Sequence, residues 1–281
     1  MIALGSRVAR GVRLTTAGMR ALPDFIIIGA SKCGTTSLYD YLTSHPLVLP
    51  AAAKEVHFFD DLRNFDRGQR WYRSWFPRQS TLDTAAKGFD VERAICGEST
   101  PIYLAHQKAP ARIAATVPTA RLIVLLRNPV ERAWSQYRMF QPWMNTDEDF
   151  GTAVRAEADR LPGGFSMLED RQSRHLFVAS SLATRGRYAE QLAWWFAEFP
   201  RHQLLMLRSE DLFADPENTF GRVCEFLGLP SVHRSHFAVR NQGANTDEID
   251  PEVRAYLEEY FAEPNAELAE LTDGMIAWPS A

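Results

Sequence analysis

The sequence predicts an α/β fold in which a parallel β-sheet is flanked by helices on both faces. Three short apolar runs carry this prediction, at residues 25–28, 122–126 and 203–207. They consist almost entirely of Phe, Ile, Val, Leu and Met, a composition typical of strands buried on both faces. A helical pattern follows each run. Strands that alternate with helices in this way indicate a parallel sheet.

The expected helices have recognisable beginnings and ends. After the first strand, Leu38, Tyr41 and Leu42 share one helical face, and Pro46 ends that helix. Asn128 and Pro129 then begin a second helix, because Asn caps helices and Pro suits their first position. Further helices are expected at 188–199, 216–227 and 251–269. Residues 60–97 and 141–175 are expected to lie outside the sheet, and 230–250 to form a long loop.

Length and charge restrict the function classes. The chain has 281 residues, 46% of them hydrophobic, which is enough for one large core. We expect a single domain over residues 23–281, preceded by a basic, loosely docked tail at 1–22. The net charge of −4 gives no basic excess and argues against a nucleic-acid partner. No apolar run approaches the roughly 18 residues that a membrane span needs.

The cysteines Cys33, Cys96 and Cys224 are scattered along the chain. Their spacing fits neither a disulfide framework nor a zinc site. We therefore expect no metal, a reducing compartment and a cytoplasmic location. The sequence contains no readable signal for the oligomeric state.

The segment Gly29–Ser37 lies between the first strand and its helix and predicts an anion site. Backbone N–H groups and the positive end of the helix dipole meet there, which suits a phosphate or sulfate. Gly29 and Gly34 have the spacing of a nucleotide-triphosphate loop, but Thr35 stands where that loop requires Lys. The cation is Lys32 instead. This displacement favours a donor with a single 5'-phosphate, from which another group leaves.

A second anchor follows the second strand. Arg127 stands at the carboxyl end of that strand, where α/β folds bind ligands. Ser135 lies two turns along the helix that follows. A guanidinium and a hydroxyl in these positions can both reach one phosphate.

These segments together resemble the sulfotransferases that use 3'-phosphoadenosine-5'-phosphosulfate (PAPS). The loop pattern of that family, P-K-x-G-T-T-x-L, reads Ser31–Leu38 here, with Ser in place of Pro. Residues 127–135 resemble its 3'-phosphate segment, R-D/N-P-x-x-R-x-x-S. The resemblance implies the family's P-loop-like sulfotransferase fold, with PAPS as donor and PAP as product. It assigns nucleotide binding to Ser31, Lys32, Cys33, Gly34, Thr35, Thr36, Ser37, Arg127 and Ser135.

Residues 54–60 resemble the K-E-x-x-F-F segment of the heparan-sulfate branch of this superfamily. The resemblance implies that Glu55 is the general base, with His57 as the second candidate, because other sulfotransferases use His. Lys54, His57 and Asp60 become acceptor-side residues, and Lys32 stabilises charge on the leaving phosphate. We expect apolar neighbours to desolvate Glu55 and to make it more basic than in water.

Three further segments resemble parts of the same family. Residues 96–104 resemble G-E-K-S-P-x-Y, but Ser99 stands where the glycan-modifying enzymes often have an acceptor-side Lys. Residues 185–192 resemble R-G-x-Y-x-x-x-L, which implies that Arg185 and Tyr188 border the nucleotide. Arg240 lies where the family has a basic loop over PAPS, although the usual N-x-x-K-G pattern is not kept.

The expected function is transfer of a sulfuryl group from PAPS to a hydroxyl or amine of a carbohydrate or small-molecule acceptor. Two alternatives stay open: a P-loop nucleotide kinase or NTPase, and a non-catalytic nucleotide-binding protein on the same fold. The aromatic stretch 71–76 also has two interpretations, a packed helix or a wall of the acceptor site.

Overall fold

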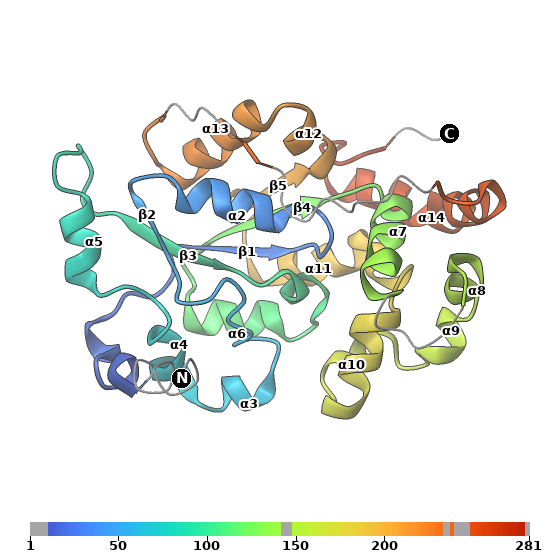
Figure 1. The fold of residues 1–281 in the computed structure, drawn as a ribbon, viewed down its shortest axis with the longest axis horizontal. Helices are drawn as coiled ribbons and strands as arrows, with labels where there is room; N and C mark the ends of the chain where they lie inside the picture. Colours follow the sequence, from blue (N-terminus) through green and yellow to red (C-terminus); the bar gives the residue numbers. More distant parts are fainter. Residues whose placement is uncertain (1–10, 142–147, 233–236, 239–247, 279–281) are drawn as a thin grey trace.

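A computed structural model describes residues 11–141, 148–232, 237–238 and 248–278. At its centre lies a five-stranded sheet in the order β2-β3-β1-β4-β5 (Figure 1), and every pairing is parallel. The strands are β1 (Phe25–Gly29), β2 (Val48–Pro50), β3 (Ile95–Ser99), β4 (Arg121–Leu126) and β5 (Leu204–Arg208). The predicted fold class is confirmed.

Two of the five strands had no sequence signal. Strands β1, β4 and β5 coincide with the three apolar runs, whereas β2 is only three residues long. Strand β3 contains Gly97, Glu98 and Ser99, so that no continuous apolar run marks it. The expectation that residues 60–97 lie outside the sheet is therefore wrong at its end, because Ile95–Gly97 pairs with β2.

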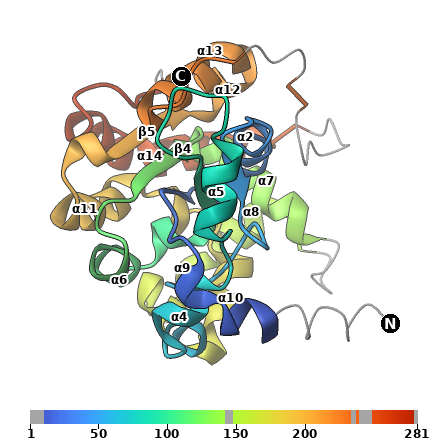
Figure 2. The same ribbon diagram turned by 90° about the vertical axis from the view of Figure 1, so that its left-hand side faces the viewer.

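Helices cover both faces of the sheet (Figures 1 and 2). Helices α2 (Thr35–Thr43), α12 (Ser209–Ala214) and α13 (Pro216–Leu227) lie on one face, and α6 (Ala109–Thr116) and α11 (Tyr188–Glu198) lie on the other. The long helix α14 (Pro251–Leu271) packs against α11 and α7 (Pro129–Phe140). Asn128 caps α7 by accepting from the N–H groups of Val130 and Glu131, as its sequence predicts.

Smaller helices surround this centre. Residues 60–94 contain α3 (Leu62–Phe65), α4 (Gly68–Arg73) and α5 (Gln79–Ala85). The described part of 141–180 contains α8 (Phe150–Arg155), α9 (Glu157–Arg160) and α10 (Arg171–Ser180). A 3₁₀ helix, η2 (Pro101–Ala105), follows β3. None of the described helices combines the length and apolarity that crossing a membrane requires.

The described part of the basic N-terminal segment contacts the chain just after α4. Arg13 donates to the carbonyl oxygens of Ser74 and Trp75, both at 2.9 Å. Arg20 donates to the carbonyl of Phe76 at 2.7 Å. These hydrogen bonds fix residues 13–20 on the body of the protein.

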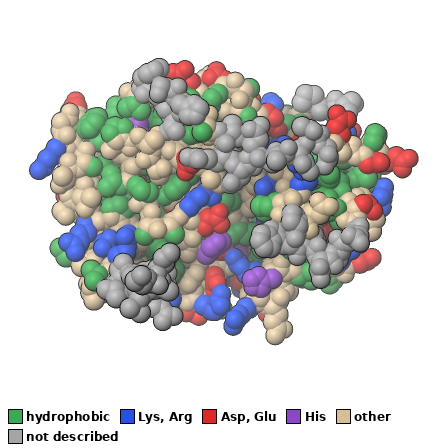
Figure 3. Space-filling model, in the orientation of Figure 1, with side chains coloured by type: hydrophobic (Ala, Val, Ile, Leu, Met, Phe, Trp, Pro, Cys, Tyr) green, Lys and Arg blue, Asp and Glu red, His purple; other side chains and the backbone are tan. Residues whose placement is uncertain are grey.

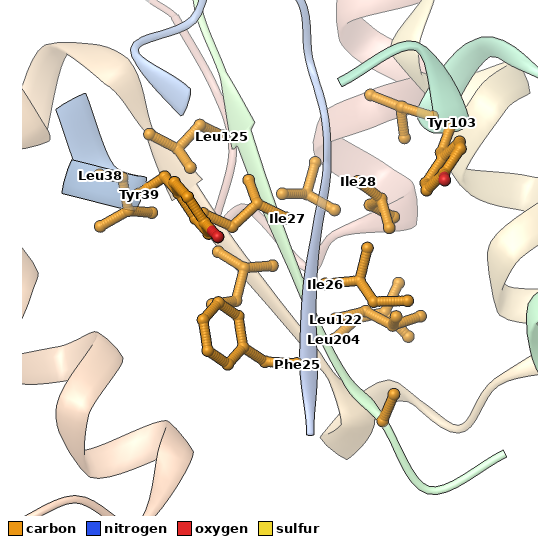
Figure 4. Close-up of a cluster of buried hydrophobic side chains, with 14 of the residues drawn as sticks. Phe25, Ile26, Ile27, Ile28, Leu38, Tyr39, Tyr103, Leu122, Leu125 and Leu204 are labelled. Carbon is orange, nitrogen blue, oxygen red and sulfur yellow. The ribbon is translucent and has the colours of Figure 1, made fainter. Parts of the chain in front are cut away.

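Side chains of β1 alternate between the two helical layers, as strand geometry requires. In Figure 4, Phe25 and Ile27 point toward Leu38 and Tyr39 of α2, and Ile28 points toward Tyr103 of η2. All four residues from Phe25 to Ile28 are fully buried. Burial of each such side chain stabilises the fold by about 1.5–3 kcal/mol, so β1 is the centre of the core.

Gly97 allows β3 to approach β1 closely. A Cβ atom at Gly97 would lie 2.5 Å from the carbonyl oxygen of Phe25. We expect Gly97→Ala to lower the free energy of unfolding by about 1–3 kcal/mol, the usual cost of overpacking. The control is Gly221→Ala in α13, where nothing lies within 4 Å and Ala should stabilise the helix by up to about 1 kcal/mol. Urea unfolding measures both; equal stabilities of the two variants would contradict the prediction.

Candidate functional site

A cleft of about 2560 Å³ lies at the carboxyl edge of the sheet. Residues that follow all five strands line it: Lys32 after β1, Lys54 after β2, Pro101 after β3, Arg127 after β4 and Ser209 after β5. Ligands bind at this edge in open α/β sheets. Figure 3 shows Lys or Arg, Asp or Glu, and His side chains gathered near the centre of one face of the molecule.

The loop between β1 and α2 has the geometry of an anion site. Gly34 caps α2 with φ of 85°, and α2 has no acidic residue in its first turn. Lys32 also has positive φ, 72°, which is uncommon for a residue with a side chain and is often found at functional sites. The hydroxyl of Ser209 donates to the carbonyl of Cys33 at 2.6 Å and holds the loop in place.

Lys32 has an unusual electrostatic environment for a lysine. Its Nζ contacts the Sδ of Met139 at 3.3 Å. Burial lowers its pKa, and so does the positive charge of Arg127. Arg132 and Arg185 act in the same direction. A cation surrounded by cations is unfavourable in the free protein, and an anion bound among them would relieve the repulsion.

Two buried arginines extend this positive region. The Arg132 side chain is fully buried, donates to Gln136 at 2.7 Å and to the carbonyl of Leu182, and has an unpaired Nε. Arg185 lines the cleft from a buried position, and burial together with Arg132 lowers its pKa to about 9. We call Lys32, Arg127, Arg132 and Arg185 the cationic cluster. Its charge and donors suit a ligand with more than one anionic group.

Arg127 is fixed at the end of β4 through its backbone. Its carbonyl accepts from the hydroxyl of Tyr188 at 3.0 Å. Its guanidinium lies 3.8 Å from Glu131, whose carboxylate also contacts Arg254 at 2.7 Å. Ser135 lines the same cleft from α7. The predicted pairing of a guanidinium and a hydroxyl at one part of the cleft is therefore compatible with the geometry.

Glu55, His57 and Asp60 form a connected group on the other side of the cleft. The imidazole Nδ1 of His57 lies 2.9 Å from Asp60, and its Nε2 lies 3.4 Å from Glu55. Glu55 also accepts from Lys54 at 2.9 Å. Asp60 is buried and contacts the guanidinium of Arg174 from α10. His57 has φ of 52°, a second strained position at the cleft.

These contacts set the charges of the group. Burial disfavours the charged form of His57, but hydrogen bonds to Asp60 and Glu55 outweigh it and raise the pKa of His57 to about 10. Burial also raises the pKa of Glu55, yet His57 and Lys54 more than compensate and hold it below its ordinary value. The expectation of a more basic Glu55 is therefore wrong. Its apolar neighbours Val56 and Phe58 are buried in the core, and its carboxylate instead contacts Lys54 and His57.

The structure places the predicted site residues in three groups. Arg240 lies outside the described residues. Four side chains are buried behind the cleft wall and do not line it: Cys33, Ser37, Tyr188 and Ser99. The others line one cleft: Ser31, Lys32, Gly34, Thr35, Thr36, Lys54, Glu55, His57, Asp60, Arg127, Ser135 and Arg185.

Sequence reasoning missed several residues that support the site. Arg174 contacts Asp60 from 114 positions along the chain. Burial raises the pKa of Glu98 to about 7. Arg132 stood inside a quoted motif but received no role. Glu98 likewise lies inside a segment that resembles a family motif, whereas Arg174 acts through a contact between distant segments that no spacing shows.

The aromatic stretch is a packed helix with an edge at the cleft. Tyr72 is fully buried and stacks on Phe58 at 4.6 Å between ring centroids. Trp71 and Trp75 pack edge to face and also contribute to the cleft lining. The interpretation as a packed helix is therefore confirmed for Gly68–Arg73, whereas a role in the acceptor site stays a prediction.

Comparisons with known proteins agree on one family. A family model described as "Sulfotransferase domain" matches residues 22–254. Human heparan sulfate glucosamine 3-O-sulfotransferase 3B1 is 32% identical over 285 residues, covering 93% of this chain and 66% of the relative. The membrane-associated sulfotransferase kil1 of Dictyostelium discoideum is 26% identical, covering 92% of this chain and 66% of the relative. The chain thus spans slightly less than two thirds of these relatives.

Solved structures show the same fold. The sulfotransferase from Alicyclobacillus acidocaldarius matches with a TM-score of 0.66 and 26% identity, covering 91% of this chain and 98% of that one. A mouse sulfotransferase, SULT7A1, complexed with PAP, matches with a TM-score of 0.52 and 12% identity, covering 93% and 92%. The second similarity concerns the fold alone.

Asp60 should control the protonation of His57. We expect Asp60→Asn to lower the pKa of His57 from about 10 toward its ordinary 6.5, because a hydrogen-bonded negative charge is lost. The imidazolium would then lose its proton at lower pH than in the unmodified protein. NMR titration of the His57 ring measures this. Asp61→Asn is the control, because Asp61 pairs with Arg63; an unchanged His57 titration in Asp60→Asn would contradict the prediction.

Proposed function

The chain belongs to the sulfotransferase domain family, and we propose that it transfers the sulfuryl group of PAPS to a hydroxyl or amine of a carbohydrate or small-molecule acceptor. The products are PAP and a sulfated acceptor. No metal is required by this scheme.

The cationic cluster is the observation that carries the proposal. Lys32, Arg127 and Arg185 line the cleft beside the α2 N-terminus, and their charges disfavour one another. PAPS carries anionic groups at both its 3' and 5' positions, so that it matches several separated cations better than a ligand with one phosphate. Positioning and charge stabilisation are the main means by which proteins catalyse such transfers.

Donor binding divides between the two anchors in this proposal. The loop around Lys32 and the hydroxyls of Thr35 and Thr36 hold the phosphosulfate. Arg127 and Ser135 hold the 3'-phosphate. Lys32 stabilises the charge that develops on the bridging oxygen of the 5'-phosphate as the sulfuryl group leaves.

Charge distinguishes the two candidate bases. Glu55 has a lowered pKa and is ionised at neutral pH, so that it can accept a proton. His57 has a pKa raised to about 10 and is already protonated there. These directions support Glu55 as the general base and give His57 the role of orienting it.

The step then balances as follows. The acceptor oxygen or nitrogen forms a bond to sulfur, and the bond between sulfur and the 5'-phosphate oxygen breaks with its electron pair on that oxygen. The acceptor proton moves to Glu55. Formation of the new bond to sulfur makes the acceptor group more acidic, so a carboxylate of low pKa suffices to receive its proton.

The acceptor class is the less constrained part of the proposal. The human relatives are named for heparan sulfate glucosamine, which favours a carbohydrate acceptor. Ser99 departs from the family's Lys and lies buried behind the cleft wall. A screen of glycans and small alcohols or amines with radiolabelled PAPS tests the function; absence of labelled product and of PAP release with every acceptor would overturn it.

Calorimetry separates the proposal from the kinase alternative. We expect PAP to bind and the complex of ATP with Mg²⁺ to bind much more weakly, because Thr35 replaces the lysine of a triphosphate loop. The opposite order of affinities would favour a kinase or NTPase.

Glu55→Gln should abolish transfer while preserving donor binding. Loss of a general base costs roughly 10²–10⁴ in rate, whereas the donor contacts are made by the cationic cluster. Turnover of labelled PAPS and calorimetry with PAP measure the two effects. Glu190→Gln is the control, because Glu190 pairs with exposed Arg187 away from the cleft lining. Near-normal turnover of Glu55→Gln would show that another group is the base.

Arg127→Ala should instead weaken donor binding. Loss of a hydrogen bond to a charged group costs about 1.5–3 kcal/mol, which corresponds to a rise in the KM for PAPS of about 10- to 100-fold. Arg187→Ala is the control: it removes an exposed arginine that pairs with Glu190, and it should leave the KM for PAPS unchanged. An unchanged KM in Arg127→Ala would remove its 3'-phosphate assignment.

A further inference from the structure

Glu98 is a fully buried carboxylate that the proposed mechanism does not use. It lies in β3, next to the strand end, and its side chain does not line the cleft. A buried carboxylate is costly unless hydrogen bonds or cations compensate it. Its partners therefore indicate what it does.

Hydrogen-bond donors surround both oxygens of Glu98. Oε1 accepts from the hydroxyl of Tyr72 at 2.6 Å and lies 3.3 Å from that of Tyr103. Oε2 accepts from the hydroxyl of Thr100 at 2.6 Å and from the backbone N–H of Val56 at 3.4 Å. The last contact joins Glu98 to the segment that carries Glu55 and His57.

Alternate residues of that segment are attached to β3 and η2. The carbonyl of Lys54 accepts from the N–H of Ser99 at 3.1 Å. The N–H of Val56 also donates to the hydroxyl of Thr100 at 3.1 Å, and the N–H of Phe58 donates to the hydroxyl of Tyr103 at 3.0 Å. Thr100 and Tyr103 both contact Glu98, so one carboxylate organises the attachments at Val56 and Phe58. Glu55 and His57 stand between these attachments and line the cleft.

The ionised form of Glu98 fits these partners better than the protonated form. The N–H of Val56 can only donate, and Tyr72 and Thr100 lie at distances suited to strong donation to a carboxylate. A proton on Oε1 would require the Tyr72 hydroxyl to turn from donor to acceptor, and a proton on Oε2 would lie opposite the N–H of Val56, which cannot accept it. Among the described residues, the other titratable groups that interact with it include Tyr39, Tyr103 and Asp60, none of which is a cation, so hydrogen bonds stabilise its charge.

We propose that ionised Glu98 is a positioning residue that holds the segment 54–58, and with it Glu55, in the orientation required for proton transfer. The inference rests on the proposed role of Glu55. Burial raises the pKa of Glu98 to about 7, against its hydrogen bonds, which lower it. The carboxylate is therefore present above that value and is lost as the pH falls through it. Neither Glu55, with a lowered pKa, nor His57, at about 10, titrates in this window.

Hydrogen exchange tests the positioning without any acceptor. We expect Glu98→Gln to accelerate amide exchange of a peptide covering 54–59 by about tenfold or more at about one pH unit above the Glu98 pKa, because a hydrogen bond to a charged group is lost. About one pH unit below the Glu98 pKa, the ratio of the exchange rate in the variant to that in the unmodified protein should fall toward one, because both proteins then lack the charge. A ratio that is independent of pH, or no acceleration, would overturn the proposal.

Asp24→Asn is the matched control. Asp24 is also a carboxylate bound to β3, since it accepts from the N–H of Cys96 at 2.9 Å and pairs with Arg93, but it lies at the opposite end of the strand. Its loss should destabilise the sheet without a pH-dependent change in exchange of 54–59. A matching, pH-dependent acceleration in this variant would show that Glu98 acts only on general stability.

Activity provides the second test. In the unmodified protein, kcat with PAPS should fall as the pH decreases through about 7. Glu98→Gln should lower kcat without raising the KM for PAPS, and its kcat should not show this fall near pH 7. Tyr72→Phe should move the fall in kcat to higher pH, because it removes a hydrogen-bond donor to the carboxylate. Absence of turnover in the unmodified protein would refute the proposed function, whereas turnover with identical pH profiles in all three proteins would refute the role of Glu98 alone.

Discussion

The parallel pairing of β1 with β3 on one side and β4 on the other brings the loops after these strands to a single edge of the sheet. Lys32 follows β1, Pro101 follows β3 and Arg127 follows β4, so residues about 95 positions apart lie at one cleft. The pairing requires close approach of the backbones, which Gly97 permits, and a core that buries all of β1. The chemistry of the cleft depends on this register.

The two sides of the cleft have different electrostatic environments. On the loop side, Lys32, Arg132 and Arg185 repel one another in partly or fully buried positions, a cost that a bound anion relieves. On the other side, the carboxylates of Glu55 and Asp60 contact cations: Lys54 and His57 for Glu55, and His57 and Arg174 for Asp60. The loop side is therefore prepared for a negatively charged ligand. The contacts on the other side instead maintain the protonation states of its own residues.

Local patterns in the sequence predicted those strands and loops that are determined by residues close together in the chain. Continuous apolar runs identified β1, β4 and β5, and the displaced Lys32 identified the kind of anion loop. Strand β3 could not be identified in this way, because its buried Glu98 is stabilised by donors that include the Tyr72 hydroxyl and the N–H of Val56, which no local pattern shows.

The error about Glu55 has a similar physical origin. The sequence shows apolar neighbours, but in the fold those side chains turn into the core, and Glu55 instead contacts Lys54 and His57. His57 in turn owes its charge to Asp60, which is held by Arg174 from a distant helix. The charge of His57, and through it the pKa of Glu55, depends on contacts made in the assembled cleft, so that the apolar neighbours of Glu55 alone were a poor guide to it.

In the proposed mechanism, Glu55 and Glu98 are two carboxylates with different purposes in one site. The backbone of Val56 links them, yet their environments move their pKa values in opposite directions: cations lower that of Glu55, and burial raises that of Glu98. Such separation is how a protein assigns distinct roles to chemically identical groups. A base has to be ionised whenever an acceptor arrives, which the lowered pKa ensures. Glu98 does not line the cleft, so it is not placed to receive the acceptor proton, but a carboxylate that titrates near neutrality can make the placement of the base depend on pH without changing the base itself.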